Sequence, residues 1–266
     1  ARTAIRLEAL EGREVPAVLI QLDYTYDTGF FANNPAARAT LEQAAADVGG
    51  ILSSDLAAIA PSGGDTWTAT FVDPATGAYR SMANPTVGAN TLRVFVGARP
   101  LAGDHTGYAM TGGASYAGSA AWVEAVRTRG HAGFSTWGGS VAFDSDASWH
   151  AAPGTDPQPG QMDLYSVAVH ELGHVLGIGT SPQWAAAVSG SSFTGAHAQA
   201  VYGGPVPLSD DGDHWADGVT AGGQSTAMDP ILMSGTRVTW SALDAAALRD
   251  LGWAVGGPAS PPPAPA

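Results

Sequence analysis

The run from His170 to His174 reads His-Glu-Leu-Gly-His and combines residue types that can bind a metal and move a proton. Residues four apart lie one above the other on the same face of a helix, so the two imidazoles can bind one zinc ion with Glu171 beside them. The preceding segment is apolar enough for a buried helix, and Asp163 is suited to cap its start. Imidazoles and charges in a buried helix are costly unless they are paired or bind metal. The pattern predicts a zinc hydrolase site on a helix over about 162–176.

Two histidines leave a zinc ion without its third protein ligand, and the rest of the sequence limits the choice. No Glu follows Glu171, which excludes the thermolysin-like class, whose glutamate ligand comes from a downstream helix. Two histidines remain downstream, His197 and His214. His197 lies in a segment typical of an exposed amphipathic turn, whereas His214 lies in a polar loop beside the bulky Trp215. The sequence favours His214 as the third ligand, with His197 as the alternative.

The spacing resembles that of the metzincin zinc peptidases, whose motif is HExxHxxGxxH. Gly177 matches the motif glycine, but Thr180, a poor zinc ligand, stands where the motif has its third His. The segments HELGHVLGIGT, DGDHW and ILMSGTRVTWSALDAAALRDLGW resemble the leishmanolysin-like subgroup, in which an insertion precedes a distal His and a methionine-containing turn. The resemblance implies that His214 completes the zinc site and that Met233 is the turn methionine beneath the metal. Met228 is the weaker candidate, because a small Ser-Gly pair that allows chain reversal follows Met233.

Upstream of the helix, residues 137–144 are similar to the edge strand and following loop of the matrixins, another metzincin group. Ala142 replaces the matrixin histidine that binds a structural zinc, so no second zinc is expected. Ala147 replaces an acidic calcium ligand, but Asp144 and Asp146 are spaced suitably to hold a calcium ion. The alternative is a solvated acidic loop.

The elements that must position these residues indicate an α/β fold of the α+β kind. Strands are predicted at 15–26, 67–72, 91–98 and 140–143, and helices from Pro35 after an Asn34 cap and from Ser241 to about Leu251 after a capping-box-like start. The glycine-rich segment 103–118 is predicted as a long loop, and the chain between the active helix and Ser241 as mostly coil. This order is similar to the two-lobed metzincin plan: a mixed twisted sheet with two long helices above the zinc cleft, and a coil-rich lower lobe with a C-terminal helix.

A length of 266 residues allows one large domain with an ample core. We expect a single metzincin-like catalytic domain over 1–255, with an upper lobe at about 1–178 and a lower lobe at about 179–255. The family resemblance covers about 134–253. Residues 256–266 are typical of a Pro-rich tail or linker.

The composition limits the partners and the location. The chain has no Cys, hence no disulfide, and its net charge is −13, with Arg as every one of its 11 basic residues. Neither nucleic acid nor an anionic membrane is expected as a partner of so acidic a chain. No apolar run approaches the roughly 20 residues that span a bilayer. The resemblance implies a secreted, extracellular protein, or one attached to the cell surface through a missing C-terminal region.

The expected function is that of a secreted zinc-dependent endopeptidase, acting as a monomer on a protein or peptide substrate. Zn²⁺ would activate a water, Glu171 would act as the general base, and the strand near 140–143 could pair with an extended substrate. One alternative is a noncatalytic, zinc-stabilised surface or adhesion module, against which the intact Glu171 argues. The other is a zinc amidase acting on a non-protein substrate.

Overall fold

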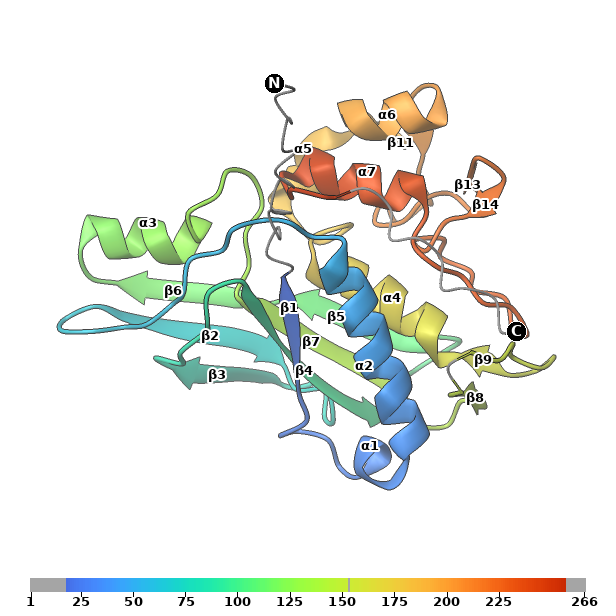
Figure 1. Cartoon of the computed structure of the whole chain (residues 1–266), viewed down its shortest axis with the longest axis horizontal. Coiled ribbons are helices and arrows are strands. Elements are labelled where there is room, and N and C mark those ends of the chain that lie inside the picture. Colours follow the sequence, from blue (N-terminus) through green and yellow to red (C-terminus); the bar gives the residue numbers. More distant parts are fainter. Residues whose placement is uncertain (1–17, 153, 257–266) are drawn as a thin grey trace, which may run out of the picture.

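A central four-stranded sheet forms the core of residues 18–178, called the upper part of the molecule below although it is drawn in the lower half of the view in Figure 1. The structure, a computed structural model, describes residues 18–152 and 154–256. The start of the strand predicted at 15–26 and the predicted tail after Gly256 lie outside these residues. The strand order is β1-β4-β7-β5, from β1 (Leu19–Asp23), β4 (Thr91–Arg99), β7 (Gly138–Asp144) and β5 (Gly107–Thr111). The first three strands are parallel, and β5 runs antiparallel to β7 at one edge.

The strand predicted at 140–143 exists as β7, but it lies inside the sheet. The prediction that it is an edge strand open to a substrate is therefore wrong, since β4 and β5 pair with its two sides. The edge position belongs to β5, which arises from the glycine-rich segment predicted as a loop. Its glycines reflect close packing instead: a Cβ at Gly107 would collide with the Glu171 carboxylate, and one at Gly112 with the Trp137 ring.

Two long helices cover one face of this sheet, as the sequence predicted (Figure 1). They are α2 (Pro35–Gly50) and α4 (Leu164–Val175). Helix α2 starts at Pro35 as expected, but the Asn34 side chain makes no capping bond and donates to Phe30 O instead. Side chains of β4 alternate between the two faces of the sheet. Val94 packs toward the helices, while Phe95 joins the aromatic cluster on the opposite side.

A second, three-stranded sheet contributes Trp67 and Phe71 to that aromatic cluster. Its order is β3-β2-β6, from β3 (Tyr79–Ala83), β2 (Thr66–Val72) and β6 (Gly113–Ala117). Phe71 of β2 stacks on Phe95 at 4.2 Å between ring centroids, and Trp137 packs edge-on to both. The short helix α1 (Phe30–Asn33), helix α3 (Ala120–Thr128) and the strand pair β8 (Trp149–His150) with β9 (Met162–Asp163) complete the upper part.

The lower part holds more regular structure than the predicted coil. It contains α5 (Pro182–Ala187), α6 (Ala196–Tyr202), α7 (Ala242–Leu251) and five short strands: β10 (Val188–Ser189), β11 (Ser192–Phe193), β12 (Val206–Pro207), β13 (Thr220–Ala221) and β14 (Gln224–Ser225). The predicted capping box at the start of α7 is present, with Ser241 and Asp244 exchanging side-chain to backbone bonds. The whole is a mixed α+β fold consistent with the predicted metzincin-like plan. No helix among the described residues is long and apolar enough to cross a bilayer.

Candidate active site

Helix α4 carries the His-Glu-Leu-Gly-His motif and is held firmly at both ends. At its start the Asp163 side chain accepts a hydrogen bond from Ser166 N, as predicted, and pairs with Arg237 at 2.7 Å. At its end Gly177 adopts a φ of 101°, and a Cβ there would lie 2.7 Å from the Phe134 ring. The left-handed conformation and the close packing both require glycine at this turn.

Three imidazoles converge where α4 meets the loop before Trp215. The Nε2 atom of His174 lies 3.1 Å from that of His170 and 3.0 Å from that of His214. The three ligand atoms all lie within 4.8 Å of one another, and among the described residues no other group of three such side chains has this geometry. His170 and His174 are buried, and the His214 side chain is 19% exposed.

The outer nitrogen of each ring is already occupied. His170 Nδ1 donates to Ala227 O at 2.8 Å, and His174 Nδ1 donates to Ile178 O at 2.9 Å. His214 Nδ1 donates to the Asp211 carboxylate at 2.9 Å. These partners leave the three Nε2 lone pairs facing one another, the arrangement in which protein histidines bind metal.

The spacing of the nitrogens matches a zinc ion. In a tetrahedral site with Zn–N bonds of about 2.0–2.1 Å, neighbouring nitrogens lie roughly 3.3 Å apart. The separations of 3.0 and 3.1 Å in the structure are close to that value. Without a shared cation, these inward lone pairs would repel one another. The donor set, three imidazoles with their outer nitrogens fixed, therefore fits Zn²⁺.

Burial sets the protonation of the helix residues. It lowers the pKa of His174 to about 4 and that of His170 well below its usual range, and the neighbouring imidazoles lower both further. Both rings are thus neutral at pH 7, the form that binds metal. Burial also raises the pKa of Glu171 to about 8. This brings the proton affinity of Glu171 near neutral pH, where a general base is most effective.

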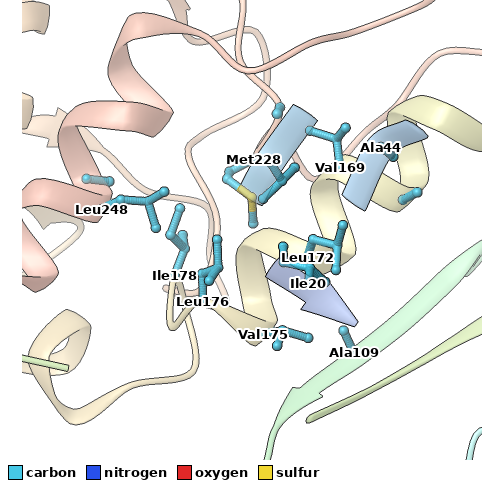
Figure 2. Packing of buried hydrophobic residues seen from close by; sticks show 14 of the residues in the cluster. Ile20, Ala44, Ala109, Val169, Leu172, Val175, Leu176, Ile178, Met228 and Leu248 are labelled. Carbon is cyan, nitrogen blue, oxygen red and sulfur yellow. The ribbon is translucent and has the colours of Figure 1, made fainter. Parts of the chain in front are cut away.

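The methionine beneath the histidines is Met228, and the prediction of Met233 is wrong. Met228 is fully buried, and a Cβ at Gly173 of α4 would collide with its sulfur. Figure 2 shows the Met228 side chain against α4, in the same cluster as Leu172 and Leu248. Met233 is 65% exposed. The Ser-Gly pair after Met233 does mark a turn, with a φ of 76° at Gly235, but that turn packs on Pro159 and not under α4.

The alternative third ligands lie elsewhere. His197 is exposed, and its Nδ1 atom pairs with Asp250 at 2.8 Å. The Thr180 hydroxyl donates to the main-chain oxygen of His174 at 2.6 Å, so it faces the end of the α4 main chain and not the imidazole nitrogens.

Asp144 uses one carboxylate oxygen to accept from Leu101 N and Asp146 N. Calcium binding by Asp144 and Asp146 stays a prediction.

The sequence missed Asp244, a buried carboxylate on α7 that links two parts of the site. It accepts hydrogen bonds from Ala227 N at 2.8 Å and from Trp215 Nε1 at 2.9 Å. Ala227 in turn accepts from His170, and Trp215 follows His214 in the chain. The capping-box-like pattern at Ser241 predicted the start of this helix, but the contacts of Asp244 to Ala227 and Trp215 are long-range and have no local signal.

Comparison with known families gives one match. The family model described as Matrixin matches residues 120–193, from α3 to β11. The matched segment contains His170, Glu171 and His174 but ends before His214. No curated protein and no solved structure matches the chain significantly. Over this segment, less than a third of the chain, the protein is similar to the matrixins, and two of the three clustered histidines lie within it.

Proposed function

We propose that the protein is a zinc-dependent endopeptidase, with His170, His174 and His214 as the zinc ligands and Glu171 as the general base. The observation that carries the proposal is the convergence of three imidazole Nε2 atoms beside a buried glutamate. A purely structural zinc site is closed by four protein ligands and needs no base, whereas three ligands leave a position open for water. We further propose the distal-histidine arrangement of the leishmanolysin-like subgroup, because forty residues separate His174 from His214.

His170, His174 and His214 would hold zinc as neutral imidazoles, and the bound ion would supply a Lewis acid that lowers the pKa of a water toward about 7. Glu171 would take a proton from that water and pass it to the leaving amine. Its carboxylate lies directly against Gly107, where any Cβ would collide with it, so only glycine leaves room for the base at this position. The surrounding burial keeps bulk water from competing for the same carboxylate.

Strand β5 is the element suited to bind a peptide. It is the edge of the four-stranded sheet, and Gly107 at its start contacts Glu171. An extended peptide added to the outer edge of β5, which pairs with no other strand among the described residues, would run past the general base, with main-chain hydrogen bonds to the sheet. This supports a peptide substrate over a small non-protein amide. An extracellular location is proposed from the family resemblance alone.

The test is hydrolysis of casein by the zinc-loaded protein. We expect cleavage that stops when 1,10-phenanthroline removes zinc and returns on its readdition. Glu171→Ala should bind zinc and lack activity, while Glu124→Ala, which alters an exposed residue of α3, should retain it. Zinc binding without cleavage by the native chain would favour the noncatalytic module. Hydrolysis of small acyl amides but not of casein would favour the amidase.

A further inference from the structure

We propose that Asp211 is a positioning residue that orients His214 toward the metal, so that the third ligand depends on a side-chain carboxylate. The inference rests on the proposed zinc site. Its basis is an asymmetry among the three ligands. His170 and His174 come from one buried helix, and their outer nitrogens donate to backbone carbonyls. The outer nitrogen of His214 donates to Asp211, whose side chain is 50% exposed.

Asp211 is the centre of the loop that carries His214. Its Oδ1 atom accepts from the Ser209 hydroxyl at 2.5 Å and from Asp213 N at 2.9 Å. Its Oδ2 atom accepts from His214 Nδ1. One carboxylate therefore folds the loop and fixes the ring within it. Both oxygens are engaged, so rotation of the carboxylate cannot satisfy His214 without breaking the loop contacts.

The ends of the loop are anchored to the rest of the lower part without help from Asp211. Leu208 N donates to Ser191 O, and Trp215 N donates to Met228 O. The Trp184 indole donates to Gly212 O at 2.9 Å. These bonds hold the main chain, but none of them touches the imidazole. The main chain thus brings His214 near the helix, while the ring orientation is left to Asp211.

A carboxylate that accepts from a metal-bound imidazole fixes its tautomer and raises the basicity of the ligating nitrogen. Loss of such a partner costs about 10-fold to 100-fold in metal affinity. The neighbouring acidic residues do not share this role. Asp210 is exposed, and Asp213 meets Asp211 through its backbone N–H. The loop therefore offers a matched control of the same residue type one position away.

The experiment measures zinc affinity by chelator competition, and the visible spectrum of the cobalt-substituted protein, for three variants. Asp211→Ala should lose about 10-fold to 100-fold in zinc affinity and show an altered cobalt spectrum. Asp211→Asn, which keeps an oxygen acceptor, should lose less. Asp210→Ala should match the native protein in both measurements.

Metal-free Asp211→Ala also loses the loop contacts from Ser209 and Asp213 and should melt slightly below the native chain, whereas metal-free Asp210→Ala should not. Native zinc affinity and an unchanged cobalt spectrum in Asp211→Ala would overturn the inference while leaving the peptidase proposal intact. So would a lower melting temperature of the metal-free variant with unchanged zinc affinity. A native chain that binds zinc but cleaves no peptide would contradict the proposed function and leave the role of Asp211 standing.

Discussion

The Asp244 carboxylate accepts a hydrogen bond from the indole nitrogen of Trp215 at 2.9 Å, joining the C-terminal helix to the residue next to His214. The same carboxylate accepts from Ala227 N, and Ala227 O accepts from His170. One buried side chain therefore helps to position both His170 and His214, which come from distant parts of the chain. Burial raises the pKa of Asp244, although hydrogen bonds from Ala227, Ser241 and Trp215 act in the opposite direction.

We expect Asp244→Ala to be among the most destabilising single changes in the chain. It leaves Trp215 Nε1 and Ala227 N buried without an acceptor, at about 1–3 kcal/mol for each donor, and removes the capping box of α7, at about 1 kcal/mol. Urea denaturation should show a loss of at least about 3 kcal/mol in the free energy of unfolding. Asp55→Asn, a change at an exposed residue, is the control and should stay within about 0.5 kcal/mol of the native protein.

The sequence predicted those parts of the site that are determined by residues close together in the chain. The helix cap at Asp163, the two histidines one turn apart and the capping box at Ser241 each follow from spacing within a few residues. The choice of His214 over His197 drew on the loop around each residue, and the structure brings His214 to the other two.

The parts that failed depend on contacts between distant segments. Strand β5 looked like a loop because Gly107 at its start and Gly112 just after its end are needed where Glu171 and Trp137 pack closely, which no local pattern reveals. Met228 and Met233 both lie in turn-like sequence, and only packing under Gly173 separates them. The strand β7 was predicted correctly, but it lies inside the sheet because β5 pairs with its outer side.

The two methionines give a direct test of that correction. Met228→Ala should lower the free energy of unfolding by roughly 2–5 kcal/mol, because it opens a cavity beneath α4. Met233→Ala should change it by less than about 0.5 kcal/mol, since that side chain is largely exposed. Thermal and urea unfolding of the zinc-loaded variants measure both. Equal losses in the two variants would contradict the placement of Met228 as the methionine beneath the histidines.

Calcium binding at Asp144 and Asp146 stays a prediction that solution measurements can decide. One Asp144 oxygen already accepts two backbone N–H groups, so the ion would have to use its other oxygen together with Asp146. Millimolar calcium should raise the melting temperature of the zinc-loaded protein, because a ligand that binds only the native state stabilises it. Asp146→Asn should abolish the shift. An unchanged melting temperature in the native protein would identify the segment as a solvated acidic loop.

The raised pKa of Glu171 predicts how the metal-free protein responds to pH. Its folded pKa of about 8 exceeds the ordinary value of 4.5, so the folded state binds more protons than the unfolded state between these values. Stability from this residue is therefore lost as pH rises from about 4.5 to about 8. The lowered pKa of His174, about 4 against 6.5, has the opposite sign, with stability gained as pH rises to about 6.5. The contribution of Glu171 is therefore clearest between about pH 6.5 and 8.

Glu171→Gln isolates this contribution, because glutamine keeps the size of the side chain and cannot ionise. In the metal-free protein, the melting temperature of Glu171→Gln minus that of the native chain should increase steadily from about pH 4.5 to pH 8 and then level off. The subtraction cancels the histidines, which both proteins share. Differential scanning calorimetry with chelator present measures the two curves. A difference that is constant across this range would mean that Glu171 titrates near its ordinary pKa, and that burial does not prepare it to hold a proton at neutral pH.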